Sequence, residues 1–318
     1  MNYDVILGFD ITNPRSIIAA QINSFALTDE PDAPLANTAP PPTFSDIAER
    51  TDSSTPPPDA LPVLALDMHT GGTLNVDGVS INNQTSFSPD VAALGSKPLA
   101  IKINNKGPQV LIVHTHSSES YAPTASNWYE STDPTRSEDM SQTVMHVGEE
   151  MAKTLNDMGI NTIQDRGIHD YPSYTGSYAS SLASDEKYLQ EYPSIKVIID
   201  VHRDAMQRDD GTRIKDETTI NGQKVAQVML VCGTNGNGLY DPNWQENLAF
   251  AMKWQTQMNN DYGNLTRAID LRADRFNTHL TTGSVLLEVG SCVNTLDEAV
   301  RGGQLAAQSL GNLLLGKQ

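Results

Sequence analysis

Five ionisable side chains follow or interrupt apolar runs of the sequence. They are His114, His116, Glu119, His202 and Glu288. The first three follow a buried-strand pattern in VLIVHTHSSES, the fourth ends the apolar run of IKVIIDVHRD, and the fifth lies inside SVLLEVG. Imidazole and carboxylate groups are the ligands of catalytic zinc, which lowers the pKa of a bound water to about 7. The five residues therefore predict a metal-dependent hydrolase, with Glu288 as general base and the others as zinc ligands.

Each of these positions also has a structural interpretation. A histidine at a strand end is commonly held by hydrogen bonds alone, whereas a carboxylate within an apolar strand is costly unless it is paired, metal-bound or protonated. Glu288 is therefore the strongest anomaly. The HxxE spacing lets His116 and Glu119 reach one ion, and His114 with Glu119 is equally plausible. Side chains two positions apart on a strand share a face, so the spacing does not choose between the two histidines.

Two arginines complete the predicted site. Arg203 follows His202 directly, and Arg275 is the first residue of the segment RFNTHL. Either guanidinium could bind a substrate carboxylate or stabilise an oxyanion, and surface salt bridges explain both arginines about as well. Asp204 could orient His202 or cap the following turn.

The pattern from residue 106 onward explains how distant residues could meet. Apolar, β-branched runs alternate with amphipathic helices, such as the helix predicted over 142–158 with Gly159 as its stop. The sequence T-x-x-E from Thr295 to Glu298 predicts a capping box at the start of the last helix. Such alternation predicts an α/β fold with a mostly parallel central sheet and helices on both faces. Parallel strands end at the same edge of a sheet, so we expect the ionisable segments to converge there.

The N-terminal part of the chain has a different composition. Nine of the 18 prolines lie between residues 31 and 62, and residues 1–70 contain ten acidic residues, two arginines and no lysine. This composition predicts an extended, largely disordered region over 1–70. Short alternating segments predict a small β-containing region over 71–105, which leaves 106–318 as the catalytic domain.

Charge and cysteine content exclude several functions. The net charge of −18 argues against nucleic acids and anionic membrane surfaces, because both require a basic face. The two cysteines are not in a CxxC pair, so they predict one disulfide or two buried thiols rather than a thiolate metal site. No apolar run reaches the ~18 residues of a membrane span.

Five segments, in order, closely resemble the stage II sporulation protein P family. They are VHTHSSESY, IHDYPSYTGSY, YPSIKVIIDVHRDA, RFNTHL and LLEVGSCVNTLDEA. The resemblance implies a zinc-dependent N-acetylmuramoyl-L-alanine amidase that hydrolyses peptidoglycan and also cleaves peptide cross-links. By position, His202 matches a family ligand, Glu288 matches the catalytic glutamate, and the HTHSSES segment supplies the remaining ligands.

The resemblance also implies partners and a location. Members of the family act with stage II sporulation proteins D and M on the septal wall, between the mother-cell and forespore membranes, during engulfment. Members also carry an N-terminal membrane anchor, so membrane attachment would need an anchor that this chain lacks.

Two other functions fit part of the pattern. The HxxE spacing also occurs in zinc carboxypeptidases, which would release one terminal residue rather than a whole stem peptide. A wall-binding scaffold without catalysis would bind sacculi without solubilising them. The products of a wall digest distinguish all three.

Overall fold

The computed structural model describes residues 5–6, 9–10, 55–69, 71–104 and 106–317. The chain divides into two compact units, residues 1–33 and 34–318. In the first unit, strands β1 (Val5–Ile6) and β2 (Phe9–Asp10) pair antiparallel. The predicted extended region over 1–70 falls mostly outside the described residues, so it stays a prediction.

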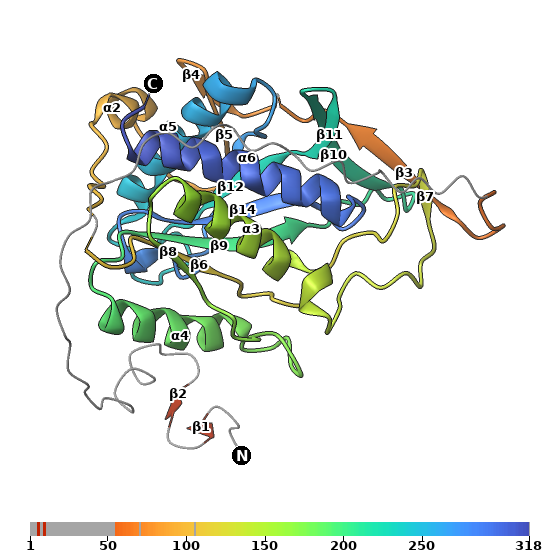
Figure 1. The fold of residues 1–318 in the computed structure, drawn as a ribbon, viewed down its shortest axis with the longest axis horizontal. Coiled ribbons are helices and arrows are strands. Elements are labelled where there is room, and N and C mark those ends of the chain that lie inside the picture. The colour runs from red at the N-terminus through yellow and green to blue at the C-terminus, as the bar shows by residue number, and fades with distance from the viewer. Residues whose placement is uncertain (1–4, 7–8, 11–54, 70, 105, 318) are drawn as a thin grey trace. The chain divides into compact units, whose positions relative to one another are not determined.

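An eight-stranded sheet forms the centre of the second unit (Figure 1). The β4–β5 and β12–β14 pairs are antiparallel, and the other five neighbouring pairs are parallel. The predicted mostly parallel sheet is therefore confirmed. In spatial order the strands are β4 (Leu74–Val76), β5 (Val79–Asn83), β13 (Ile269–Leu271), β12 (Val228–Cys232), β14 (Ser284–Ser291), β9 (Val197–Asp204), β6 (Val110–Val113) and β8 (Thr162–Gln164).

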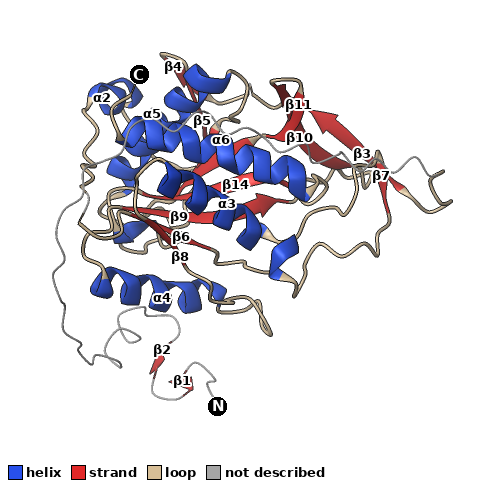
Figure 2. Ribbon diagram, viewed as in Figure 1, coloured by secondary structure: helices blue, strands red, loops and turns tan. Residues whose placement is uncertain are grey.

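Helices lie on both faces of this sheet, as the sequence predicts (Figure 2). The helices α3 (Val144–Asp157), α5 (Trp244–Tyr262) and α6 (Leu296–Leu314) pack on one face, and α4 (Ser177–Glu191) packs on the other. A short helix, α2 (Val91–Ser96), packs beside α5. Successive residues of β6 separate the two cores, because Ile112 joins the α3 core and Val113 joins the smaller α4 cluster.

Local signals define the helix ends that the sequence predicts. The Thr295 hydroxyl accepts from the Glu298 backbone N–H at 3.2 Å, and the Glu298 carboxylate accepts from the Thr295 N–H at 3.0 Å. This capping box starts α6 as predicted. Gly159 follows α3 with φ +84°, a conformation that glycine adopts without the strain of a side chain.

A second, four-stranded sheet has the order β11-β10-β3-β7. Its strands are β11 (Gln223–Ala226), β10 (Arg213–Ile220), β3 (Leu61–Leu66) and β7 (Trp128–Tyr129). The mostly apolar run over 225–233 would suit a single strand, but it is interrupted at Gln227, and β11 and β12 lie in different sheets. The structure also places β3 within the region predicted as extended, and β4 and β5 of the predicted 71–105 region within the central sheet.

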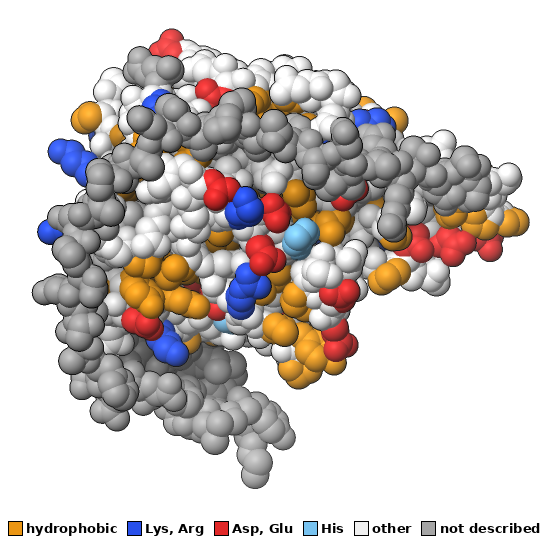
Figure 3. Space-filling model, viewed as in Figure 1, with side chains coloured by type: hydrophobic (Ala, Val, Ile, Leu, Met, Phe, Trp, Pro, Cys, Tyr) orange, Lys and Arg blue, Asp and Glu red, His pale blue; other side chains and the backbone are white. Residues whose placement is uncertain are grey.

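Several surface features bear on the predictions. Figure 3 shows acidic and basic side chains interspersed across the middle of one face, with apolar side chains gathered to either side of them. Every helix in the described part of the chain is too short or too polar to cross a bilayer. Cys232 and Cys292 are both buried and unpaired, which decides between the two predicted states in favour of free thiols.

Candidate active site

The carboxyl ends of three neighbouring parallel strands, β6, β9 and β14, build one edge of the central sheet. The Cα atoms of Glu288 on β14 and His202 on β9 are paired in register. Side chains at paired positions of parallel strands lie on the same face, so these two residues are immediate neighbours. Residues separated by 86 positions therefore meet at the edge that the sequence analysis predicted.

A bulge directly after Glu288 shapes this part of the site. The pairing of β14 with β9 shifts register between Glu288 and Ser291, and Gly290 has φ +67°. A Cβ at Gly290 would lie only 2.8 Å from the Cβ of Ala226. Only glycine fits this close approach in a left-handed conformation. The glycine in the sequence LLEVGS thus allows the strand to bend where the carboxylate is presented.

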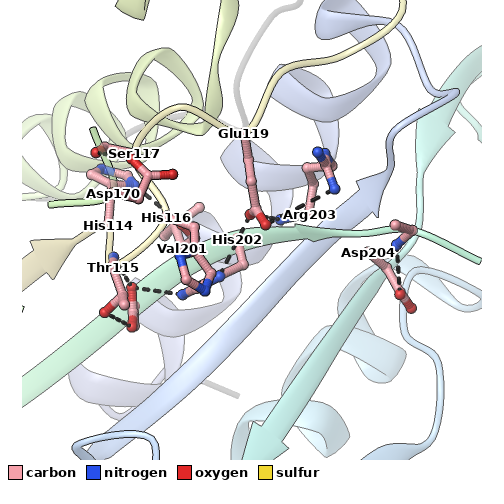
Figure 4. A network of polar contacts seen from close by, with 12 residues as sticks. His114, Thr115, His116, Ser117, Glu119, Asp170, Val201, His202, Arg203 and Asp204 are labelled. Atoms are coloured by element: carbon pink, nitrogen blue, oxygen red, sulfur yellow. Dashed lines mark hydrogen bonds and ion pairs between the residues drawn. The ribbon is translucent and has the colours of Figure 1, made fainter. Parts of the chain in front are cut away.

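Glu119 extends from the loop after β6 toward β9 (Figure 4). Its Oε2 atom lies 3.5 Å from Nδ1 of His202 and accepts a hydrogen bond from the backbone N–H of Arg203 at 3.2 Å. The carboxylate is almost completely buried. It is therefore held between two consecutive residues of β9, with one oxygen beside the imidazole.

Asp200 is a site residue that the sequence analysis missed. Its Oδ1 atom lies 3.0 Å from Nε2 of His202 and accepts from the Thr115 N–H at 2.9 Å, while Oδ2 accepts from the Thr115 hydroxyl at 2.7 Å. The available signal was its position: residues two apart on a strand share a face, so Asp200 had to lie beside His202.

Asp204 does not orient His202. Its carboxylate caps the turn through the N–H of Ala205 at 2.7 Å and pairs with Arg267 at 2.9 Å. Figure 4 shows it well apart from His202, farther along the strand. Of the two roles considered for Asp204, the structure supports the turn.

His114 is sealed beneath α3. Only 1% of the residue is exposed, its Nδ1 lies 3.2 Å from the Val201 carbonyl oxygen, and its Nε2 lies 3.0 Å from the side-chain nitrogen of Gln164. The ring also lies so close to Gly148 of α3 that a Cβ there would overlap it. Burial lowers the pKa of His114 to about 4, so the ring is neutral and donates from Nδ1. Both ring nitrogens have protein partners.

His116 lies on the α4 side of the sheet instead. Its ring centroid is 5.1 Å from that of His202, and it stacks on Tyr174 at 4.5 Å. Its Nε2 lies 3.1 Å from the Tyr174 hydroxyl, whereas its buried Nδ1 has no hydrogen-bond partner. Of the two histidines that the sequence left open, His116 is therefore the one beside His202 with a free nitrogen.

Arg203 is buried and its guanidinium is committed to the protein. Its Nε donates to the Ser120 carbonyl at 3.1 Å, its Nη2 to the Thr135 carbonyl at 2.6 Å, and its Nη1 lies 3.9 Å from Glu119. These contacts commit Nε and Nη2 to backbone carbonyls, and a substrate contact for Arg203 stays a prediction. Arg203 fixes the loop that carries Glu119.

Arg136 is a second residue that the sequence analysis missed. It lies 3.6 Å from Glu119, pairs with the buried Asp170 at 2.5 Å, and is 39% exposed. Asp170 in turn accepts from the hydroxyls of Ser117 and Ser118 at 3.0 and 2.6 Å. This network holds the HTHSSES segment in place. No sequence spacing links Arg136 to it, since the contact depends on how the loop folds back.

Arg275 is placed on the loop before the 3₁₀ turn η2 (Thr278–Leu280). Its Nη1 donates to the Tyr240 carbonyl at 3.3 Å, and its buried Nε has no partner. Two residues later, Asn277 donates to the Tyr178 carbonyl at 2.9 Å, and Tyr178 lies edge-on to His116. The loop thus borders the site, and a substrate contact for Arg275 stays a prediction.

The electrostatics of the site separate its two glutamates. Burial raises the pKa of Glu288 to about 8, which the nearby His202 only partly offsets. Burial also disfavours ionisation of Asp200, but His202 and the Thr115 hydrogen bonds lower its pKa to about 2. For Glu119 the same burial is outweighed by His202 and Arg203, so its pKa is lowered. The carboxyl group of Glu288 is thus largely protonated at neutral pH, and those of Glu119 and Asp200 stay ionised.

The donor types at this edge fit a zinc ion. His116, Glu119 and His202 offer two imidazoles and a carboxylate. Nδ1 of His116 and Oε2 of Glu288 are buried without a hydrogen-bond partner, whereas the ring of His202 lies between Asp200 on its Nε2 side and Glu119 on its Nδ1 side. Buried polar atoms are nearly always satisfied, so the two unpartnered atoms, on residues that both neighbour His202, indicate a missing partner. As the side chains of the described residues stand, no three ligand-type groups form a closed metal cluster. Glu119 and Asp200 instead lie against His202.

A family model supports the resemblance seen in the sequence. The model described as stage II sporulation protein P matches residues 12–311 of the 318. The chain belongs to the stage II sporulation protein P family. The predicted family is therefore confirmed, and the match includes every residue proposed for the site.

Individual relatives are more distant. Stage II sporulation protein P of Bacillus subtilis (strain 168) is 29% identical over 209 residues, which cover 62% of this chain and 49% of that protein. The chain thus spans about half the length of this curated relative. Among solved structures, AmiC2 of Nostoc punctiforme, an N-acetylmuramoyl-L-alanine amidase, is 14% identical with a TM-score of 0.39, covering 67% of this chain and 97% of its own. The CwlD amidase of Clostridioides difficile, in complex with the GerS lipoprotein, is 11% identical with a TM-score of 0.40, covering 66% and 100%. The family assignment stands on the family match alone.

Proposed function

We propose that this protein is a zinc-dependent peptidoglycan hydrolase that cleaves the amide bond between N-acetylmuramic acid and L-alanine, and peptide cross-links as well. The observation that carries the proposal is the in-register pairing of Glu288 with His202, beside His116 and Glu119. Membership of the stage II sporulation protein P family supports the substrate class.

In this proposal His116, Glu119 and His202 hold the zinc ion. Their donor atoms are the types zinc prefers, His116 has a buried nitrogen without a hydrogen bond, and Nδ1 of His202 lies 3.5 Å from the Glu119 carboxylate. His114, the alternative from the sequence, has partners on both nitrogens. When bound, zinc would polarise the scissile carbonyl and lower the pKa of the attacking water.

Glu288 is the proposed general base. A carboxyl group whose pKa lies near 8 is mostly protonated at neutral pH, and the charge of a bound zinc ion would lower that pKa. The carboxylate could then accept a proton from water and return it to the leaving nitrogen. Its unpartnered Oε2 is the atom free to do so. No other carboxylate of the site fits this role, because the pKa values of Glu119 and Asp200 are lowered.

Asp200 and Arg203 act through their neighbours. Asp200 lies against the Nε2 side of His202 and fixes the orientation of the ring, as a carboxylate commonly does for a metal-binding histidine. Arg203 anchors the loop that carries Glu119. Arg275, at the border of the site, is proposed to bind a carboxylate of the stem peptide.

The wider role follows the family. We propose that residues 106–318 form most of the catalytic domain, completed by strands β4 and β5, and that the protein acts on septal wall between the mother-cell and forespore membranes. Stage II sporulation proteins D and M are the proposed partners. Attachment to the membrane is part of the same proposal.

A digest of purified sacculi, analysed by mass spectrometry with and without a chelator, tests the proposal. Whole stem peptides with a free L-alanine amino group are expected, and full removal of zinc should abolish their release. Release of single terminal residues would instead indicate the carboxypeptidase that the HxxE spacing suggests. Binding to sacculi without any release would indicate a scaffold, and cleavage that survives zinc removal would exclude the mechanism.

A further inference from the structure

The loop between β8 and α4 carries an exposed tyrosine in direct contact with the site. Tyr174 is 57% exposed, yet its ring lies nearly parallel to that of the buried His116, with an interplanar angle of 15°. Its hydroxyl lies 3.1 Å from His116 Nε2. An exposed tyrosine would ordinarily turn its hydroxyl to water. Here the group is directed to a nitrogen of a proposed ligand.

Buried contacts keep this tyrosine in place. Asp170, four residues earlier on the same loop, accepts hydrogen bonds from Ser117 and Ser118, which flank His116 on its C-terminal side. The guanidinium of Arg136 pairs with Asp170 and also lies 4.9 Å from the centre of the Tyr174 ring. Asp170 and Arg136 thus connect the loop to the HTHSSES segment next to the contact between Tyr174 and His116.

The two nitrogens of His116 consequently have different environments. Nε2 faces the tyrosine hydroxyl, and Nδ1 is buried without a partner. A histidine that binds a metal through one nitrogen almost always donates its other N–H to a fixed acceptor, which sets the tautomer and the ring orientation. A phenolic oxygen can accept that hydrogen bond.

We propose that Tyr174 is the positioning residue of His116: its hydroxyl oxygen accepts from Nε2–H, so that Nδ1 is the nitrogen presented to the metal. This inference rests on the proposed function, since it assumes that His116 is a ligand. It assigns a role to the family segment IHDYPSYTGSY, of which Tyr174 is part. In this role Tyr174 acts through His116, so its effect is on zinc affinity and on the imidazole itself.

Tyr174→Phe removes the hydroxyl and keeps the stacked ring, and Tyr171→Phe is the matched control. Tyr171 is 51% exposed on the same loop, and its hydroxyl interacts with Glu138 rather than with His116. Chelator competition on the full chain measures the zinc dissociation constant. We expect Tyr174→Phe to raise it about 10- to 100-fold, the usual effect of losing such a partner, and Tyr171→Phe to leave it unchanged.

A second measurement needs no metal. Nitrogen-15 spectra of the imidazoles in the zinc-free protein, with His116 assigned through His116→Asn, report which ring nitrogen carries the proton. We expect protonated Nε2 in the wild type and a mixture of tautomers in Tyr174→Phe. Tyr174→Ala, which also removes the stacked ring, should weaken zinc binding at least as much.

The outcomes separate this inference from the proposed function. Equal zinc affinity of wild type and Tyr174→Phe, or equal loss in both tyrosine variants, overturns the role of Tyr174 and leaves the zinc hydrolase standing. A wild-type protein that binds no zinc overturns the proposed function. In that case the tautomer of His116 in the zinc-free spectra decides whether the hydroxyl holds Nε2.

Discussion

His114 and His116 are two positions apart in one segment, yet they lie on opposite sides of the central sheet. His114 continues the α3 face of β6 and ends in a closed environment of Gly148, Gln164 and the Val201 carbonyl. His116 turns to the α4 face, where it meets His202 and Tyr174. The comparison shows how a protein can use one residue type for structure and for chemistry within three positions. The structural histidine, His114, has hydrogen-bond partners on both ring nitrogens, whereas the proposed ligand, His116, has one nitrogen without a partner.

Removal of the base on the α4 side should have the largest effect. Glu288→Gln keeps the size of the side chain but cannot accept a proton, so we expect turnover on sacculi to fall about 10²- to 10⁴-fold. Zinc content and the melting temperature should stay at wild-type values. A variant that retains full activity would place the base elsewhere.

Alanine variants of the two histidines test directly whether one is a zinc ligand and the other is structural. Loss of a residue that only hydrogen-bonds a metal ligand weakens metal binding by up to about 100-fold. His116→Ala should weaken zinc binding by more than this, because it removes a ligand. His114→Ala should keep its zinc but lose about 1–3 kcal/mol of unfolding free energy, since it leaves a cavity and frees buried polar groups. Metal analysis and urea unfolding measure the two effects, and the reverse pattern would identify His114 as the ligand.

Asp200→Asn tests whether orientation of His202 matters on the same side. We expect zinc affinity to fall about 10- to 100-fold, because an amide no longer stabilises the ring as the ionised carboxylate does. Asp204→Asn is the matched control on the same strand, and its zinc affinity should not change, because Asp204 contacts Arg267 instead. Similar losses in both variants would argue for a general effect of negative charge.

Gly148→Ala tests the closed side and should have the smallest effect. The added methyl group overlaps the ring of His114, so either the ring or α3 must shift, at a cost of about 1–3 kcal/mol in unfolding free energy. Specific activity per folded molecule should be retained. If activity falls while stability is unchanged, then the two sides of the sheet are coupled more closely than their contacts indicate.

Much of the fold could be predicted from the sequence. The apolar runs of β6, β9 and β14 are buried on both faces of a parallel sheet, so they appear as continuous hydrophobic segments. The strands missed were short or polar. β13 has three residues, and β10 contains Lys215 and Asp216, whose charges are buried only because Glu298 and Arg267 pair with them. Such pairing is invisible until the partners are placed.

By itself the sequence determined that histidines and carboxylates stand at the ends of apolar strands, and that those ends must share an edge of the sheet. The tertiary structure decided which of them meet there. The face on which His114 lies, the contact of Asp200 with His202 and the approach of Tyr174 to His116 all depend on strand order and loop conformation. These contacts join residues distant in the chain, and no local pattern specifies the direction in which a loop returns to the sheet.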